Sequence, residues 1–100
     1  MMDWQLKNNI VLIDCGKSVE LECIQTQKEI LSEALQEYKP IVLLANEINH
    51  IDTASLQLLL VFIREATKKN IKVKWQEPSD SLLYSANLIG LKAVLELPEK

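Results

Sequence analysis

The sequence predicts an α/β fold, in which a small mixed β-sheet of four or five strands packs against three or four helices. Two observations favour this class. Short apolar runs rich in β-branched residues alternate along the chain with longer segments whose apolar residues recur at helical spacing. The first two strand-like runs have no helix between them, whereas the later ones are separated by helices. This order indicates an initial hairpin and helices mainly on one face of the sheet.

The length and composition predict one domain. The chain has 100 residues, of which 48% are hydrophobic and 25% charged. A chain of this size can bury one hydrophobic core but is too short for two. We therefore expect residues 1–100 to form a single globular domain.

The first strands are expected near the N-terminus. Residues 10–15 form an apolar run that Gly16 closes, which is typical of a strand and a turn. Residues 19–24 alternate apolar side chains with glutamates, which is typical of a strand with one buried face. The simplest arrangement is a hairpin in which these two segments pair.

A helix and a buried strand are expected next. Thr26 and Glu29 form a capping-box pattern, and apolar residues at helical spacing follow, so we expect an amphipathic helix that stops before Pro40. Residues 41–45 are continuously apolar. Such a run is typical of a central strand that is buried on both faces.

The second half of the chain predicts the longest helix. Asp52 is a suitable N-cap residue, and residues 53–69 follow it as a helix that is apolar nearly all round. Asn70 is the expected C-cap. A helix of this kind is buried on more than one side or presents an apolar strip to a partner, which a second copy of the chain could equally provide.

The remaining elements are shorter. Residues 71–75 predict a strand, residues 78–80 open a third helix that runs to Ile89, and Gly90 ends it. Residues 93–97 fit either a final short strand or a helical turn.

Charge and localisation signals exclude several functional classes. The formal net charge of −3 and the pI near 5.1 argue against nucleic-acid binding. The lysines that cluster after the second helix suit a soluble strand edge better than a basic patch; they are Lys68, Lys69, Lys72 and Lys74. No signal peptide is recognisable, and the longest apolar run, residues 58–63, is far below the roughly 20 residues of a membrane span. We therefore expect a cytoplasmic protein without membrane insertion.

Catalytic and cofactor chemistry is not expected. Cys15 and Cys23 should be reduced, small, strand-borne hydrophobic residues, and their spacing with one histidine matches no zinc pattern. His50 lies near the hydroxyl of Thr53, but a nucleophile also needs a base that a third group orients. The chain has two glycines and no glycine-rich phosphate loop. The sequence thus predicts a protein that is not an enzyme and has no cofactor or metal.

The segment Asp52-Thr53-Ala54-Ser55-Leu56 resembles the Asp-Ser/Thr-x-Gly-Leu signature of the STAS domain, named for sulfate transporters and anti-sigma factor antagonists. The apolar strand before it, the long helix after it, the lysine-rich strand and the closing Ser-Ala-Asn-Leu-Ile-Gly-Leu also follow STAS order. The resemblance spans nearly the whole chain and implies the STAS fold.

The resemblance also implies a function. STAS domains of the Asp-Thr-Ala type act by contact with a protein partner, so we expect a regulatory interaction module that docks through residues 46–55 and the exposed strip of the second helix. The implied partner is a histidine-kinase-like or anti-sigma kinase, a chemotaxis component or the ATPase of a phospholipid ABC transporter. The implied partner-binding residues are Asn49, His50, Asp52, Thr53, Ser55, Gln57 and Arg64.

The alternative that the family offers is an anti-sigma factor antagonist that phosphorylation switches off. The hydroxyl modified in that branch lies two residues after the aspartate, where this chain has Ala54, and Ser55 replaces the usual glycine. Thr53 and Ser55 are the remaining candidate acceptors.

Overall fold

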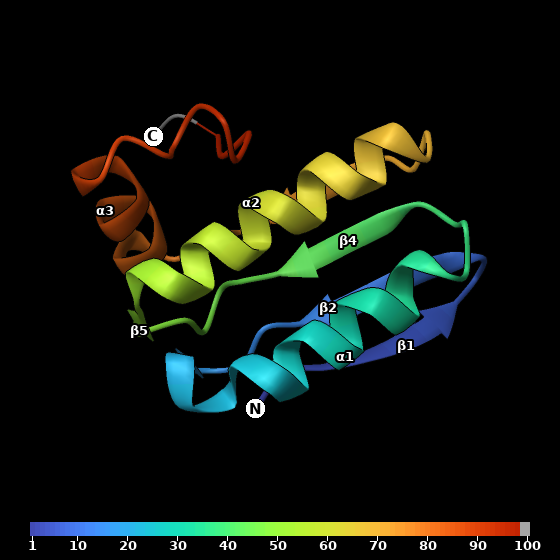
Figure 1. The fold of residues 1–100 in the computed structure, drawn as a ribbon, viewed down its shortest axis with the longest axis horizontal. Coiled ribbons are helices and arrows are strands. Elements are labelled where there is room, and N and C mark those ends of the chain that lie inside the picture. The colour runs from blue at the N-terminus through green and yellow to red at the C-terminus, as the bar shows by residue number, and fades with distance from the viewer. Residues whose placement is uncertain (99–100) are drawn as a thin grey trace.

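The computed structural model describes residues 1–98 as strands and helices that alternate along the chain (Figure 1). In chain order these are β1 (Asp3–Lys7), β2 (Ile10–Asp14), β3 (Ser18–Val19), the short 3₁₀ helix η1 (Leu21–Cys23), α1 (Ile24–Leu35), β4 (Ile41–Leu44), β5 (His50–Ile51), α2 (Thr53–Lys68), β6 (Val73–Gln76) and α3 (Asp80–Leu88). The predicted α/β class is confirmed.

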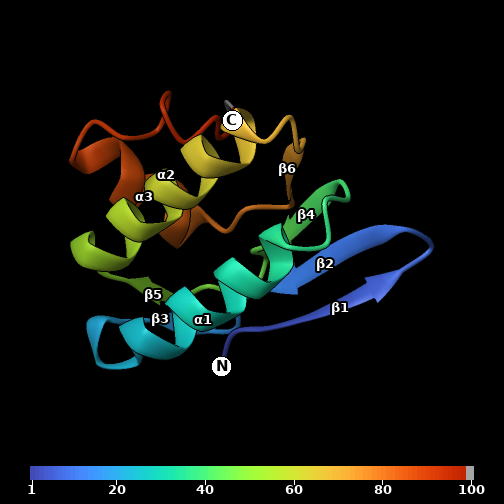
Figure 2. The same cartoon turned by 45° about the vertical axis from the view of Figure 1, so that its right-hand side comes forward.

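Two sheets organise the chain. The larger has the strand order β1-β2-β4-β6, with β1 antiparallel to β2 and the other neighbours parallel; the smaller pairs β3 with β5 in parallel. Helices α1 and α2 lie side by side on one face of the larger sheet (Figure 2). This arrangement is the mixed sheet with helices on one face that the element order predicted.

The predicted hairpin partner is wrong. Residues 10–15 do contain β2, but its antiparallel partner is β1, a strand that was not predicted. The two-residue turn between them is Asn8-Asn9, and both residues have positive φ, 54° and 63°. Turns of this kind match the twist of a hairpin, and asparagine tolerates positive φ better than most residues.

Residues 19–24 do not form one strand either. Only Val19 belongs to a strand, and residues 21–23 form η1, whose last residue is the N-cap of α1. The side chain of Gln27 turns back to donate to the Glu20 carbonyl, 2.9 Å away, and so stabilises this compact turn. An apolar and acidic alternation over six residues therefore fits a helix entrance as well as a strand.

The start of α1 also differs from the prediction. The helix begins at Ile24, and its N-cap, Cys23, makes no side-chain capping bond, so the capping box of Thr26 and Glu29 is wrong. Helix α1 ends at Leu35, ahead of Pro40 as predicted.

Helix α2 ends close to the predicted position, but its C-cap is Lys69, and Asn70 is the residue after the cap. Asn70 has φ of 59°, its amide donates to the Thr67 carbonyl at 3.0 Å, and the Ile71 amide donates to the Ala66 carbonyl at 2.8 Å. This pair of bonds is a Schellman motif, in which the buried Ile71 packs back toward the helix.

The predicted third helix is confirmed, as α3. Ser79 caps it by accepting from the Leu82 amide at 3.1 Å. Gly90, with φ of 75°, follows its last turn, and the Leu91 amide donates to the Ala86 carbonyl at 2.9 Å. Both ends of α3 are therefore set by the residue types that the sequence placed there.

The last strand of the large sheet and the tail follow the sequence closely. The strand predicted over residues 71–75 is β6, which begins two residues later and lies at the edge of the sheet with Lys74 exposed. Residues 93–97 form the helical turn, not the strand, because the Leu95 amide donates to the Leu91 carbonyl at 2.9 Å. The Leu95 carbonyl in turn accepts from Trp75 Nε1 at 2.8 Å, which attaches this turn to β6.

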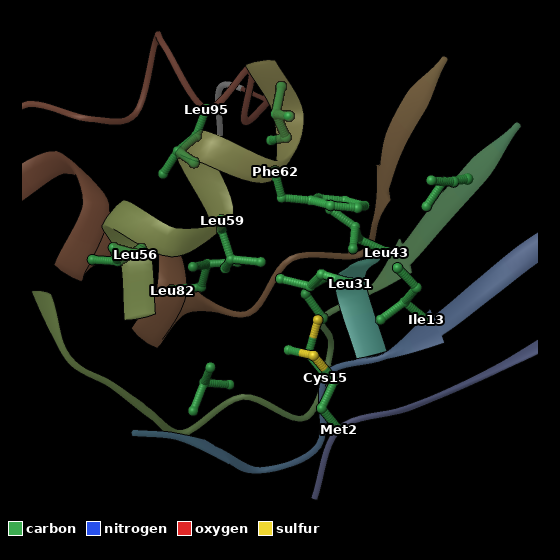
Figure 3. Close-up of a cluster of buried hydrophobic side chains, with 14 of the residues drawn as sticks. Met2, Ile13, Cys15, Leu31, Leu43, Leu56, Leu59, Phe62, Leu82 and Leu95 are labelled. Carbon is green, nitrogen blue, oxygen red and sulfur yellow. The ribbon is translucent and has the colours of Figure 1, made fainter. Parts of the chain in front are cut away.

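The hydrophobic core lies between the large sheet and the helices (Figure 3). Its labelled members come from the sheet, from the segment just after β2, from α1, α2 and α3, and from the terminal segments; they are Met2, Ile13, Cys15, Leu31, Leu43, Leu56, Leu59, Phe62, Leu82 and Leu95. Within residues 1–98, no helix is long and apolar enough to cross a membrane.

The two cysteines have different environments, and both are free. Cys15 is buried in the core as predicted, and burial, with a smaller contribution from the Asp14 carboxylate, raises the pKa of its thiol to about 12. Cys23 is exposed at the helix N-cap, so its prediction as a strand-borne hydrophobic residue is wrong.

Candidate functional site

The start of α2 is held in place by Asp52. One carboxylate oxygen, Oδ1, accepts from the Ser55 amide at 2.9 Å, which is the N-cap bond that the sequence predicted. The other, Oδ2, accepts from the Leu21 amide at 2.7 Å, although Leu21 lies 31 positions earlier in the chain. The Asp52 amide itself donates to the Val19 carbonyl at 3.2 Å. Asp52 therefore joins α2 to the segment that leads into α1.

The electrostatics of this residue favour the ionised form. Partial burial alone would raise the pKa of Asp52, but the amides of Ser55 and Leu21, the Ser55 hydroxyl and the nearby His50 together lower it below its usual value. The Ser55 hydroxyl lies near enough to the carboxylate to lower its pKa, although it does not form a hydrogen bond with it. The carboxylate is thus charged at neutral pH and accepts from both amides.

The two candidate hydroxyls have opposite environments. Thr53 is exposed on the first turn of α2. Ser55 is fully buried, and its Oγ has no hydrogen-bond partner among the residues that the structure describes. A partner or a kinase cannot contact Ser55 while the helix start stays folded. Of the two hydroxyls, only that of Thr53 can therefore make the expected contact.

The loop before α2 is fixed by its backbone and presents its polar side chains to solvent. Ile48 and Ile51 are buried, whereas Asn49 and His50 between them are exposed. The amides of Asn49 and His50 both donate to the Lys17 carbonyl, at 2.8 and 3.3 Å. The loop thus holds Asn49 and His50 at the same end of the molecule as Thr53.

The remaining predicted contact residues lie along α2. Gln57 and Arg64 are exposed and, at 100° per residue, fall on the same helix face as Thr53. Arg64 is eleven positions after Thr53, which corresponds to about 16 Å along the helix axis. Gln57 therefore adjoins the loop, whereas Arg64 could be reached only by a partner that follows the helix.

Leu21 belongs to this site and was not predicted to do so. Its amide binds Asp52, and its side chain is 57% exposed although it is a large aliphatic group. No local pattern points to this role, because the alternation over residues 19–24 predicted a strand. The role of Leu21 depends on η1 lying beside the start of α2.

Within residues 1–98, the side chains of His50, Asp52 and Thr53 are not hydrogen-bonded to one another. Asp52 uses both oxygens on backbone amides. Among residues 1–98, no three His, Cys, Asp or Glu side chains are grouped closely enough to hold a metal ion. What the arrangement offers is a hydrogen-bonded helix N-terminus with exposed polar groups and the exposed Leu21.

Comparison by sequence identifies no relative: neither a protein-family model nor a curated protein matches this chain. Comparison by structure finds proteins with the same fold. The NMR structure of the protein TM1081 matches with a TM-score of 0.79 at 16% identity, covering all of this chain and 82% of that one. The crystal structure of TM1081, a proposed anti-sigma factor antagonist from Thermotoga maritima, matches with a TM-score of 0.80 at 15% identity, over 99% of this chain and 86% of that one.

A second similar protein is the anti-sigma factor antagonist SpoIIAA in its unphosphorylated form. Its structure matches with a TM-score of 0.75 at 14% identity and covers 93% of this chain and 84% of that one. The TM-scores establish a shared fold, and identities this low support nothing beyond the fold. The coverage shows that the shared fold extends over most of each chain.

Proposed function

We propose, on the premise that this chain has the STAS fold, that it is a non-enzymatic regulatory module of the cytoplasm that docks onto a protein partner through the start of α2. The proposed docking surface consists of Leu21, Asn49, His50, Thr53 and Gln57, with Asp52 holding it together. Arg64 extends the surface along the helix.

The main support is the double hydrogen bond of Asp52. Because its two oxygens accept from the amides of Leu21 and Ser55, Asp52 links η1 to the first turn of α2. Thr53 and Leu21 are exposed on these two segments. A preorganised surface loses little conformational entropy on binding, which favours recognition by direct docking.

The chemistry of the surface fits a protein partner. Leu21 offers an exposed aliphatic contact next to Asp52, and Asn49, Thr53 and Gln57 offer exposed polar contacts, a mixture that is common in protein interfaces. A histidine-kinase-like or anti-sigma kinase, a chemotaxis component and an ABC-transporter ATPase are the partner classes that the family resemblance implies.

The alternative is a phosphorylation switch at Thr53. It is supported by the exposure of Thr53 on the first helical turn, where a kinase could reach the hydroxyl. A phosphate there would add about −1.5 to −2 charges to the surface and alter docking by charge. Ser55, being buried, is not retained as an acceptor.

Two substitutions at Thr53 distinguish these functions. We would compare partner capture from native lysate by the wild type, Thr53→Glu and Thr53→Val, and quantify the retained proteins by mass spectrometry. If the hydroxyl is a docking contact, both substitutions weaken capture. If it is a phosphorylation site, Thr53→Val retains capture, Thr53→Glu abolishes it, and native protein contains phosphothreonine 53.

Thr67→Glu is the matched control, because Thr67 is an exposed threonine on the same helix, about 20 Å from Thr53 along the axis. All variants must first give the circular dichroism spectrum of the wild type. If Thr53→Glu and Thr67→Glu retain the same proteins as the wild type, the start of α2 is not the docking surface.

A further inference from the structure

Strand β1 has a free edge. It is an outer strand of the large sheet and, among the described residues 1–98, pairs only with β2. Along it Asp3, Gln5 and Lys7 are exposed, and Leu6 is 46% exposed. Figure 1 shows β1 at the margin of the sheet, with its free side away from β2 and β4.

The pairing of β1 with β2 determines which backbone groups face that free edge. Across a two-residue hairpin turn, Lys7 and Ile10 form a hydrogen-bonded pair, and the pairs then alternate along the ladder. The amides and carbonyls of Asp3, Gln5 and Lys7 therefore point to β2, and those of Trp4 and Leu6 point outward. The Trp4 amide donates at present to its neighbour, Asp3 Oδ1, at 2.8 Å.

The sequence of β1, Asp-Trp-Gln-Leu-Lys, is complementary to itself when reversed. If a second copy pairs antiparallel about Gln5, Asp3 lies opposite Lys7, and Trp4 lies opposite Leu6. The outward groups of Trp4 and Leu6 then form the hydrogen-bonded pairs. Asp3 and Lys7 fall in non-hydrogen-bonded pairs, whose Cα atoms are only about 4.5 Å apart and whose side chains lie closest.

We propose that a second copy of this chain binds here, so that two large sheets join through antiparallel β1 strands into one continuous sheet across a twofold axis at Gln5. The Trp4 amide then exchanges Asp3 Oδ1 for the Leu6 carbonyl of the other copy. Asp3 is left to pair with the other copy's Lys7, which also offsets the like charge of Asp14 directly opposite Asp3 in the hairpin.

The charges select this register over its neighbours. A twofold axis at Trp4 would place Asp3 opposite Gln5, and an axis at Leu6 would place Lys7 opposite Gln5, so neither pairs opposite charges. The other outer strand, β6, has the sequence Val-Lys-Trp-Gln and contains no acidic residue to match Lys74. Self-pairing is therefore specific to β1.

The dimer should be weak and reversible, because two five-residue strands bury less than the roughly 1,200–2,000 Å² of a standard stable interface. Sedimentation velocity of the full chain at concentrations from micromolar to millimolar should show a monomer–dimer equilibrium. A single monomeric species over this whole range would overturn the proposal.

Charge exchange tests the register. Asp3→Lys and Lys7→Asp each place like charges opposite one another and should weaken dimerisation about tenfold. The double variant with both substitutions restores opposite charges and should recover the wild-type dimerisation constant. The two single changes shift the net charge in opposite directions, so a shared loss is not an effect of net charge.

Lys74→Asp, the same change on the other outer strand, is the control and should leave dimerisation unaltered. Leu6→Pro tests the backbone independently: it removes an outward amide that β2 does not use, and should yield a folded monomer. Dimerisation that survives the single charge changes, or a double variant that stays monomeric, would refute β1 pairing in this register.

Discussion

At the scale of single residues, Asp52 has the largest structural role at the candidate site. Its carboxylate is at once the N-cap of α2 and the acceptor for an amide of η1. Removal of this side chain therefore affects two segments that are far apart in the sequence. Loss of binding in such a variant must be separated from loss of stability, which is why Thr53 is the better binding probe.

Asp52→Ala should lower the free energy of unfolding by about 0.5–2 kcal/mol at pH 7, because it removes the N-cap bond and leaves the Leu21 amide without its acceptor. Asp52→Asn should cost less, since asparagine is also a good N-cap. Urea unfolding of the three proteins measures the differences. Equal stability of Asp52→Ala and the wild type would contradict the structural role assigned to this residue.

The low pKa of Asp52 gives this contribution a pH dependence. The folded state binds the carboxyl proton less readily than the unfolded state, so the ionised group stabilises the protein above its usual pKa near 3.8. The contribution is lost as the pH falls through the lower folded value. The stability difference between the wild type and Asp52→Asn should therefore shrink in urea unfolding below pH 4, and a constant difference would contradict the pKa direction.

At the scale of elements, the sequence predicted best where one residue type has one structural meaning. Asp52, Ser79 and Gly90 lie at the helix ends where the pattern placed them, and β4 and α2 occupy their predicted segments. Within residues 1–29, the strand predicted over residues 10–15 is present as β2, but β1 was missed because it is short and mostly exposed and so has little apolar periodicity. The best sequence signal for β1 was the pair Asn8-Asn9, because asparagine tolerates the positive φ that a hairpin turn requires. This signal is independent of hydrophobicity.

Local sequence patterns likewise predicted only part of the candidate site. The sequence located Asp52 and Thr53 because a polar turn precedes a long apolar helix. The burial of Ser55 and the participation of Leu21 depend on how η1 packs against the start of α2, which no local pattern records.

The Asn8-Asn9 turn gives a prediction at this scale. Asn9→Ala should lower the free energy of unfolding by about 1 kcal/mol, because alanine is strained at φ of 63°, whereas Asn9→Gly should leave stability equal or higher. Thermal unfolding measures both. Asn87→Ala is the control, since Asn87 lies in the last turn of α3, where alanine is favoured and no loss is expected.

At the scale of the whole molecule, the core divides the two thiols into one that is shielded and one that is accessible. Cys15 has no exposed surface, and its high pKa keeps it as a neutral thiol at physiological pH. Thiolates are the reactive form, so native Cys15 is inert on two grounds. It becomes reactive only when the core opens.

A disulfide reagent such as Ellman's should therefore titrate one thiol per native chain, and two in denaturant. In Cys23→Ser, the remaining thiol should react no faster than the chain unfolds. Rapid reaction of that variant under native conditions would contradict the close packing around Cys15.

The hydrogen bond between Leu21 and Asp52 has a consequence for attempts to imitate the proposed docking surface. The two residues come from opposite sides of β4 in the chain order, so the surface is a discontinuous epitope. A synthetic peptide of residues 46–57 would lack Leu21 and the amide that orients Asp52, and should compete poorly for the partner. Antibodies raised against such a peptide should likewise recognise the denatured chain better than the native domain.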